Sequence, residues 1–309
     1  MSYWAQSKVS GGQASTYQIP HNISVDHWPG PGLATGGGGL VFSTHCKGWG
    51  GWVFEIGDVT HEPATPNTTN ISFSKGGWQE ARGCTGMGEF FVSHRLELLT
   101  QPGEWFHDAH SDYLYMGVRP EGGMPAETLY GPTVATIFSA QGSQHSPVRG
   151  FRVSGVVFRH IAPAFLERYA VPSGGDYSLH KGGTVLFNGT EGCTVDHCLF
   201  DGAGGNGVFL NDYNRRALVA ANEFRDMGEA AVLLSGSTDW VDGRSGNQPR
   251  FCNVTGNCEW LPCCAVHCFV VVVLLDTYGL VAVGRHTQCG ALRVASTGHH
   301  ARGGVSESH

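Results

Sequence analysis

The chain has 309 residues, with 46 glycines and only 15% charged side chains, against about 25% in a typical soluble domain. Its formal net charge is −7 and it carries no basic run or stripe, so nucleic acid is not an expected partner. A glycine-rich, charge-poor chain with 11% aromatic residues is typical of an all-β protein with many turns.

The first residues, MSYWAQSKVSGGQ, contain no apolar segment of the kind that a secretory signal peptide carries. Asparagine nevertheless falls often in the N-x-[ST] sequence that accepts N-linked glycans in secreted proteins. Five of the eleven asparagines lie in such sequences: Asn22, Asn67, Asn70, Asn188 and Asn253. We therefore expect a secreted or extracellular glycoprotein, with the alternative that Asn and Thr are simply frequent in β turns.

Residues 1–132 are expected to form an irregular, Gly- and Trp-rich β region. The segments GGWVFEIGDV, NISFSKGG and GEFFVSH are rich in β-forming residues and predict strands. Residues 103–118, GEWFHDAHSDYLYMGV, contain two β runs around AHS and predict a hairpin.

Residues 133–257 contain a repeat in which Val is followed five residues later by Phe. The clearest copies are Val153/Phe158, Val195/Phe200 and Val219/Phe224. A second set of short apolar runs, GTVLFNG, NGVFLND and AAVLLSG, keeps the same period, because Val195 to Val219 and Val208 to Val232 are both 24 residues apart. Two short β runs and Gly-rich turns per unit predict a parallel β-solenoid, whose units stack at about the 4.8 Å strand spacing.

Two insertions interrupt this repeat, at residues 162–182 and 235–250. Insertions into a stacked repeat form loops gathered on one face, which is often the binding face. Polar residues also recur at one position of three successive units: Asn188, Asn211 and Ser235. We expect these side chains to hydrogen-bond at a corner as structural residues, because Asn favours turns for local hydrogen-bonding reasons.

Several segments resemble a family of right-handed parallel β-helix proteins within the pectate-lyase-like, carbohydrate-active superfamily. They are FSKGGWQEARG, QPGEWFHDAHSDYLYM, SPVRGFRVSGVVF and the stretch from VPSGGDYSLHKGG to ANEFRDMG, within about residues 45–257. The resemblance implies a right-handed parallel β-helix and a polysaccharide or glycan partner. The wider group includes polysaccharide lyases, glycoside hydrolases and surface proteins of unassigned activity, and the resemblance assigns no catalytic residue here.

The repeat fails in the segment NVTGNCEWLPCCAVHCFVVVVLLD, residues 253–276. Val254 falls at the Val position, but Glu259 stands where Phe is required, and a buried unpaired carboxylate is costly. The apolar run from Leu261 to Leu275 has 15 residues and contains Pro262, whereas a membrane helix needs about 20 apolar residues.

The cysteines of this segment do not have the spacing of a zinc finger, because two are adjacent and no second C-x2-C pair follows. We expect residues 258–309 to be a Cys-rich tail that is not the native continuation, so that the β-helix is truncated at its C-terminal end. The alternatives are a divergent cap and, for residues 269–275, a buried strand.

No Ser-His-Asp signature, P-loop, H-E-x-x-H motif or paired C-x-x-C occurs, so any chemistry is expected from carboxylates. Asp201 follows Phe200 directly and Asp226 follows Phe224 by two, so stacking should bring the carboxylates to about 6 Å, near the range for glycoside hydrolysis. The candidate catalytic residues are Asp201, Asp226, Glu229, Asp176 and His180. The alternative is that these aspartates bond their own turn backbone.

Cationic and aromatic side chains near these carboxylates are candidates for binding a sugar chain: Lys181, Arg215, Arg216 and Trp240. A hydrolase would use one carboxyl group as proton donor and the other as base or nucleophile. A lyase would need a base near the sugar C5 proton and a cation on the uronate, supplied by these side chains or by Ca²⁺; no other cofactor or metal is expected. The alternatives to an enzyme are a non-catalytic glycan-binding or surface protein and an inactive truncated product.

Overall fold

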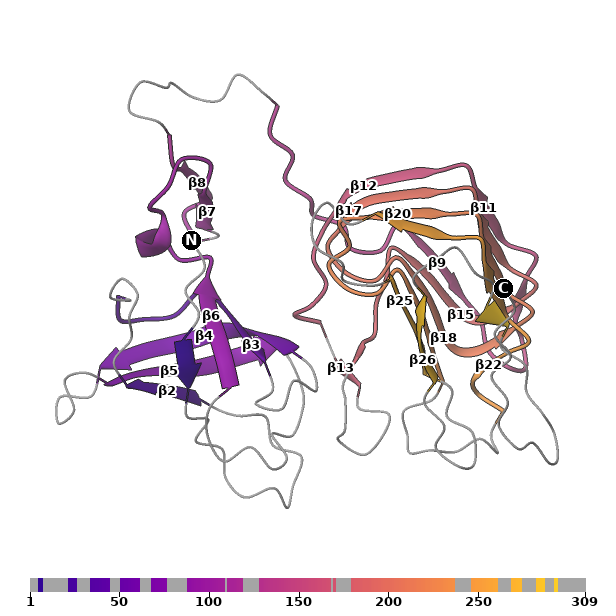
Figure 1. The fold of residues 1–309 in the computed structure, drawn as a ribbon, viewed down its shortest axis with the longest axis horizontal. Helices are drawn as coiled ribbons and strands as arrows, with labels where there is room; N and C mark the ends of the chain where they lie inside the picture. The colour runs from indigo at the N-terminus through magenta and orange to yellow at the C-terminus, as the bar shows by residue number, and fades with distance from the viewer. Residues whose placement is uncertain are drawn as a thin grey trace, which may run out of the picture. The chain divides into compact units, whose positions relative to one another are not determined.

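The computed structural model describes residues 5–7, 22–26, 34–44, 51–61, 68–76, 88–108, 110–118, 128–167, 169–170, 179–236, 246–260, 268–273, 282–286 and 292–293. In those residues the regular structure is β, apart from a single 3-10 turn, η1 (Leu96–Leu98) (Figure 1). The chain divides into two units. Unit 1 comprises Met1–Gly131 and Ala164–Lys181, and unit 2 comprises Pro132–Pro163 and Gly182–His309.

Unit 1 contains a six-stranded antiparallel sheet in the order β1–β6–β3–β4–β5–β2. The strands are β1 (Ala5–Ser7), β2 (Asn22–Asp26), β3 (Leu40–Thr44), β4 (Gly51–His61), β5 (Thr68–Gly76) and β6 (Gly88–Ser93). Strands β4, β5 and β6 coincide with the three segments predicted as strands, because each concentrates β-branched and aromatic residues. One cluster of buried side chains forms the core of this unit: Val41, Ile56, Val59, Ile71, Phe90, Val92 and Leu98.

A buried arginine holds the glycine-rich segment before β3. Arg95 is 7% exposed, and its Nε donates to Glu97 Oε1 at 2.8 Å. Its Nη atoms donate to four backbone carbonyl oxygens at 2.8–3.2 Å: those of Ala34, Gly36, Gly37 and Gly38. These bonds satisfy a buried charge and fix the path of the glycines.

Two hairpins complete the described strands of unit 1. Strands β7 (Trp105–Asp108) and β8 (Tyr113–Met116) pair antiparallel within residues 103–118, the segment expected to form a hairpin. Strands β13 (Tyr169–Ala170) and β14 (Leu179–His180) pair antiparallel within the first insertion.

Unit 2 is built from three parallel sheets that the chain visits in turn (Figure 1). The first parallel sheet contains β9 (Phe138–Gln141), β10 (Val148–Arg149), β15 (Val185–Glu191), β18 (Val208–Arg215), β21 (Val232–Ser235) and β22 (Pro249–Arg250). The second contains β11 (Arg152–Ser154), β16 (Thr194–Asp196), β19 (Leu218–Ala220) and β23 (Asn253–Thr255). The third contains β12 (Val157–Ile161), β17 (Leu199–Ala203), β20 (Glu223–Arg225) and β24 (Cys258–Trp260).

The Val and Phe positions of the repeat form two rows across neighbouring strands. The Val row pairs Val153, Val195, Val219 and Val254 in register. The Phe row pairs Phe158 with Phe200 and Phe200 with Phe224, and the rings stack with centroids 4.6 Å and 4.7 Å apart. All of these side chains are buried in one core, as the spacing of the repeat predicted.

At β18 and β21 the first parallel sheet is buried on both of its faces. Val208 and Leu210 face the core shared with the other sheets, whereas Phe209 and Leu233 alternate to the opposite face and are only 0% and 3% exposed. A near-continuous apolar run, VFL or VLL, is the sequence pattern expected of such a strand. The polar row also pairs in register as predicted, in the order Asn188, Asn211, Ser235.

The bends between the parallel sheets are made by single residues with a left-handed backbone. Between the first and second sheets these are Gly150, Gly192, Arg216 and Phe251, with φ between 54° and 68°. Between the second and third they are Gly155, His197, Ala221 and Gly256, with φ between 54° and 67°. Near the ends of the third-sheet strands they are His160, Gly202 and Asp226, with φ of 52°, 75° and 47°. Because every repeat bends at equivalent positions, the strands of successive repeats stay in register.

The last described strands depart from the repeat. Strand β25 (Cys268–Val273) pairs parallel with β21 and covers most of the strand expected at residues 269–275. Strand β26 (Ala282–His286) then pairs antiparallel with β25, and β27 (Leu292–Arg293) pairs antiparallel with β23. The register places Glu259 beside Phe224, as the repeat predicted. That residues 258–309 are not the native continuation stays a prediction.

The structure therefore confirms the coarse fold prediction, an all-β chain with several parallel sheets in its described residues. The right-handed β-helix, with its truncated C-terminal end, is a finer statement that remains a proposal. The boundaries expected at residues 132 and 257 also remain predictions.

Candidate functional site

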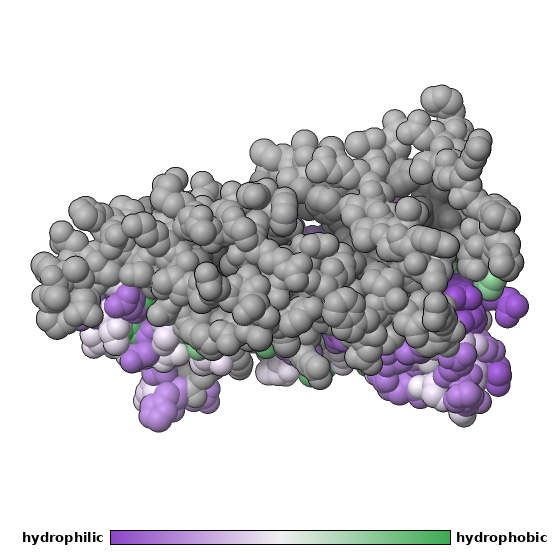
Figure 2. Space-filling model, turned by 90° about the horizontal axis from the view of Figure 1, so that it is seen from below, coloured by the Kyte–Doolittle hydropathy of each residue, from purple (hydrophilic) through white to green (hydrophobic). Residues whose placement is uncertain are grey.

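The described residues that reach the face drawn in Figure 2 are mainly hydrophilic.

Charged side chains gather on the third parallel sheet, on the face opposite the Phe row. There Asp201 pairs in register with Arg159 on one side and Arg225 on the other. Arg159 Nε donates to Asp201 Oδ2 at 2.8 Å, and the Arg159 and Asp201 side chains are 57% and 25% exposed. The Asp201 carboxylate is thus bonded to the Arg159 guanidinium, and its backbone lies one strand spacing from that of Arg225.

The second carboxylate of the predicted pair lies one residue beyond this row. Because Asp201 is in register with Arg225, Asp226 is displaced from Asp201 by one strand and one residue, as predicted from the sequence. Asp226 is exposed and has φ of 47°, a conformation that Asp tolerates better than most residues. Its place in a left-handed bend supports the alternative reading of Asp226 as a turn residue.

Arg225 links the acidic side chains of this face. Its guanidinium donates from Nε to Glu223 Oε1 at 2.7 Å. This bond raises the pKa of Arg225, and the charges of Glu223, Asp201 and Asp226 raise it further. The face therefore carries three carboxylates around a permanently charged guanidinium. We call Arg159, Asp201, Glu223, Arg225 and Asp226 the charged face of the third sheet.

Two further catalytic candidates lie elsewhere in the described structure. The half-buried Glu229 follows the charged face in the chain, and its backbone N–H donates to the carbonyl oxygen of Gly205 at 3.3 Å. His180 is 2% exposed in β14 of unit 1, and its Nε2 lies 3.4 Å from Glu167 Oε2. Asp176, which was expected beside His180, lies outside the described residues.

The predicted sugar-binding residues have different surroundings. Arg215 donates to the carbonyl oxygens of Gly246 at 2.7 Å and Gln248 at 2.6 Å, and its guanidinium lies 4.1 Å from the ring centroid of Tyr213. Burial lowers the pKa of Arg215. These contacts give Arg215 a structural role in holding the second insertion against β18.

The other three binding candidates have less defined surroundings. Arg216 is exposed and occupies a left-handed bend. Lys181 is half-buried at the end of unit 1. Trp240 lies outside the described residues.

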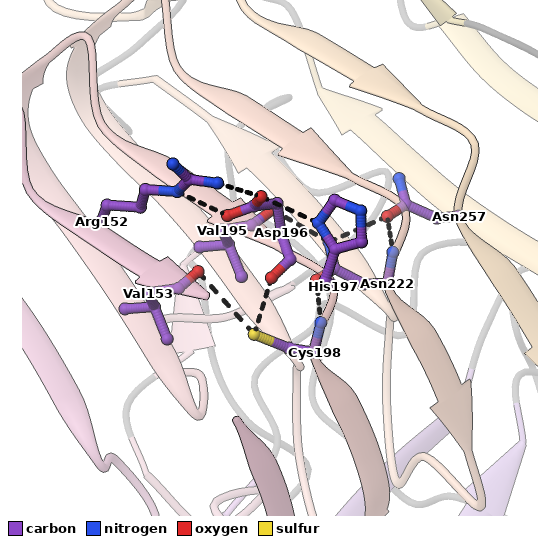
Figure 3. Close-up of polar contacts among 8 residues, drawn as sticks. All are labelled: Arg152, Val153, Val195, Asp196, His197, Cys198, Asn222 and Asn257. Carbon is purple, nitrogen blue, oxygen red and sulfur yellow. Dashed lines mark hydrogen bonds and ion pairs between the residues drawn. The ribbon is translucent and has the colours of Figure 1, made fainter. Parts of the chain in front are cut away.

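A cluster that sequence reasoning missed lies at the corner between the second and third sheets (Figure 3). Arg152 makes a bidentate bond to Asp196, Nε to Oδ1 at 2.9 Å and Nη2 to Oδ2 at 2.5 Å. His197 Nδ1 lies 2.9 Å from the same Oδ2. The Asp196 side chain is only 6% exposed, whereas that of His197 is 70% exposed. The hydrogen bonds from Arg152 hold the pKa of Asp196 well below its usual range.

This corner can present an oriented imidazole to solvent. A buried carboxylate on Nδ1 fixes the ring, as in many catalytic and metal-binding histidines. In the neighbouring repeats the position of His197 is occupied by Gly155, Ala221 and Gly256. Among the described repeats, only the one with His197 therefore carries a long side chain at this bend. In the sequence the only signal was the pair Asp196–His197 directly after a Val of the repeat.

Beside this corner a row of asparagines joins successive repeats of unit 2 (Figure 3). Asn222 Oδ1 accepts from the backbone N–H of Cys198 at 3.0 Å, and Asn257 Oδ1 accepts from that of Asn222 at 3.0 Å. Asn222 Nδ2 donates to the carbonyl oxygen of Val195 at 3.0 Å. Cys198 is buried, which raises the pKa of its thiol, so it is a core residue and not an activated nucleophile.

Neither a metal centre nor a membrane-spanning helix is found in the parts of the chain that the structure describes. No three His, Cys, Asp or Glu side chains converge there in a way that could hold a metal ion. No helix there is long and apolar enough to span a membrane.

Comparisons with known proteins give matches among solved structures only. No family model matches the chain, and no curated protein matches it. Among solved structures, a chain described as "Glycoside hydrolase" superposes with a TM-score of 0.49 at 18% identity. The match covers 69% of this chain and 42% of that one, so this chain spans less than half of its neighbour. At this identity and TM-score the likeness carries no inference about activity.

Proposed function

We propose that this chain is a carbohydrate-active protein built on a right-handed parallel β-helix, and that it binds an acidic polysaccharide along the charged face of the third sheet. The observation that carries the proposal is the row Arg159–Asp201–Arg225, with an ion pair of 2.8 Å between the first two. Guanidinium groups recognise carboxylates in a planar, often bidentate geometry. A uronate-containing chain would exchange its carboxylate for Asp201 on Arg159 or for Glu223 on Arg225.

The way the three parallel sheets connect supports the proposed β-helix. The chain visits the first, second and third sheets in order and returns to the first, and neighbouring units pair residue for residue in all three. Such a path winds around one core, which the Val and Phe rows fill. The right hand is the one that parallel crossovers adopt almost without exception.

The charged face also supplies two carboxylates for hydrolysis. The general acid and the base or nucleophile would be Asp226 and Asp201, because the exposed Asp226 can reach a glycosidic oxygen and Asp201 already accepts a hydrogen bond from Arg159. A lyase would instead use a carboxylate as the base and an arginine or Ca²⁺ on the uronate.

The second candidate function is glycan binding without turnover. The ion pair of Asp201 with Arg159 and the turn position of Asp226 favour it, since both carboxylates then have structural reasons to be where they are. In either case the sequons make secretion the expected localisation. An inactive product remains the third candidate if residues 258–309 are not native.

The test is a panel of soluble acidic polysaccharides, such as polygalacturonate and alginate, with the unchanged chain and the variants Asp201→Asn, Asp226→Asn and Arg225→Gln. Release of reducing ends indicates a hydrolase, and new absorbance from an unsaturated uronate indicates a lyase. Binding of a polysaccharide without release, weakened by Arg225→Gln, indicates the non-catalytic function.

Asp58→Asn is the control, because Asp58 is an exposed carboxylate of β4 in unit 1 and lies outside the charged face. We expect Asp201→Asn and Asp226→Asn each to lower any turnover by about 100-fold or more, in the range for loss of a general acid or base. Full rates in both variants at unchanged stability would place the active site elsewhere. Absence of both binding and turnover would contradict the proposed function.

A further inference from the structure

The hairpin of β7 and β8 in unit 1 exposes an unusual number of large apolar side chains. Tyr113 is 66% exposed and Tyr115 39% on one face of the hairpin, and Trp105 is 58% exposed and Leu114 48% on the other. Single exposed apolar residues are ordinary, but a contiguous group of them marks an interaction site.

Three of the aromatic rings share one face of the hairpin. The antiparallel register sets Phe106 opposite Tyr115 and Asp108 opposite Tyr113, and alternation puts all four side chains on the same face. The ring centroid of Tyr115 lies 6.0 Å from that of Phe106 and 6.5 Å from that of Tyr113. The face is therefore a row of three rings with a carboxylate beside its end. We call these four residues the aromatic face.

The carboxylate of the aromatic face is fixed in place. Asp108 Oδ2 accepts from Ser111 Oγ at 2.5 Å, and Oδ1 accepts from the backbone N–H of His110 at 2.9 Å. The hydrogen bond from Ser111 lowers the pKa of Asp108, so the group is a charged acceptor at neutral pH. A carboxylate has further lone-pair positions beyond the two in use.

The base of the hairpin is held by packing and by caps. The ring of His94 lies 5.7 Å from that of Trp105 and 5.2 Å from that of Phe106. Glu104 Oε2 accepts from the backbone N–H groups of Thr100 and Gln101 at 2.7 Å and 2.8 Å. The aromatic face is thus carried on a supported hairpin, which limits the entropy lost on binding.

We propose that the aromatic face binds an uncharged glycan. The C–H faces of a pyranose ring would pack on Tyr113 and Tyr115, and sugar hydroxyl groups would donate to Asp108. Anionic polymers are disfavoured because the carboxylate of Asp108 lies on the aromatic face. An apolar protein surface is less suited, because it would bury the charged Asp108 without a donor, whereas a sugar hydroxyl supplies one.

This site is independent of the charged face of the third sheet, which takes acidic sugars. The test is isothermal titration of the full chain with cellohexaose, xylohexaose and mannohexaose. We expect at least one of the three to bind, and the double variant Tyr113→Ala/Tyr115→Ala to bind it about tenfold or more weakly, as for loss of a central aromatic contact. Tyr113→Phe should keep the affinity within about twofold, because the ring and not the hydroxyl makes the contact.

The matched control is Tyr130→Ala, which removes an equally exposed tyrosine, 67%, outside the hairpin. It should leave the affinity unchanged, and thermal unfolding should be the same for all variants. The proposal is overturned if none of the three oligosaccharides binds, if the double variant binds normally, or if the hairpin residues instead govern association between protein chains. Asp201→Asn, which tests the proposed function, should not affect this binding.

Discussion

The charge of Asp196 is stabilised by a partner from the preceding repeat of unit 2. Its carboxylate is almost fully buried at the corner of Figure 3 and receives a bidentate bond from Arg152, 44 residues earlier. That bond lowers the pKa of Asp196 in the folded chain. Folding therefore favours the deprotonated form, and the stabilisation is present above the unfolded pKa of about 4 and is lost as the pH falls through the folded pKa.

We predict that Asp196→Asn lowers the free energy of unfolding at pH 7 and that its difference from the unchanged chain shrinks as the pH falls below about 4. Urea unfolding followed by circular dichroism at pH 7, 5, 4 and 3 measures this. Asp112→Asn, which removes only an exposed pair with His107, should change the free energy of unfolding by less than about 1 kcal/mol at every pH. A deficit in Asp196→Asn that is the same at every pH would contradict the role assigned to the ion pair.

At the scale of elements, a glycine-rich segment precedes β3 of unit 1, and Arg95 holds it through hydrogen bonds to its carbonyl oxygens. Gly38 and Gly39 both have a positive φ, 91° and 93°, so any side chain strains the backbone at either position. Only Gly39 also lies against Arg95, where a Cβ would come within 2.6 Å of Cδ. Because carbonyl oxygens hold the guanidinium, the arginine cannot move aside.

We predict that Gly39→Ala destabilises unit 1 by about 1–3 kcal/mol more than Gly38→Ala, the usual cost of overpacking. The pair is matched, because both variants carry the backbone strain and only one carries the clash. Chemical unfolding followed by tryptophan fluorescence gives the two values. Equal losses would show that Arg95 yields, and the inferred rigidity of the glycine segment would be wrong.

At the scale of the whole molecule, the regular pairing of unit 2 stops within the last segment. Strand β25 still pairs parallel with β21, whereas β26 and β27 pair antiparallel. The Phe row also ends, because Glu259 occupies its next position. A tail outside the repeat contributes less to the core and is expected to open more readily than the stacked units.

We predict that limited proteolysis removes much of residues 258–309 before it cuts residues 150–250. Time-resolved digestion with a protease of broad specificity, read by mass spectrometry, gives the order of cleavage. The segment of β25 should be the slowest part of the tail, because it is docked as a strand. A tail that resists as long as the stacked units would refute the proposal that it is not the native continuation.

The sequence by itself determined the repeat and its register. An interval of 24 residues between equivalent Val positions places Val195 beside Val219 and Phe200 beside Phe224, because stacking in register requires only a constant period. The same reasoning placed Asp226 one residue beyond the row of Asp201. Alternation within short strands also indicated which side chains would be buried.

Only the tertiary structure decided which side chains bond across neighbouring strands without being directly opposite, and which bond the insertions. The register pairs Asp196 with Ser154, yet its charge partner is Arg152, two residues earlier on the same strand. Arg215, a candidate for sugar binding, donates to carbonyl oxygens of the second insertion, 31 and 33 residues away. A period fixes which backbones lie side by side, but a long side chain can reach several neighbours, and its partner depends on burial and on loops that have no period.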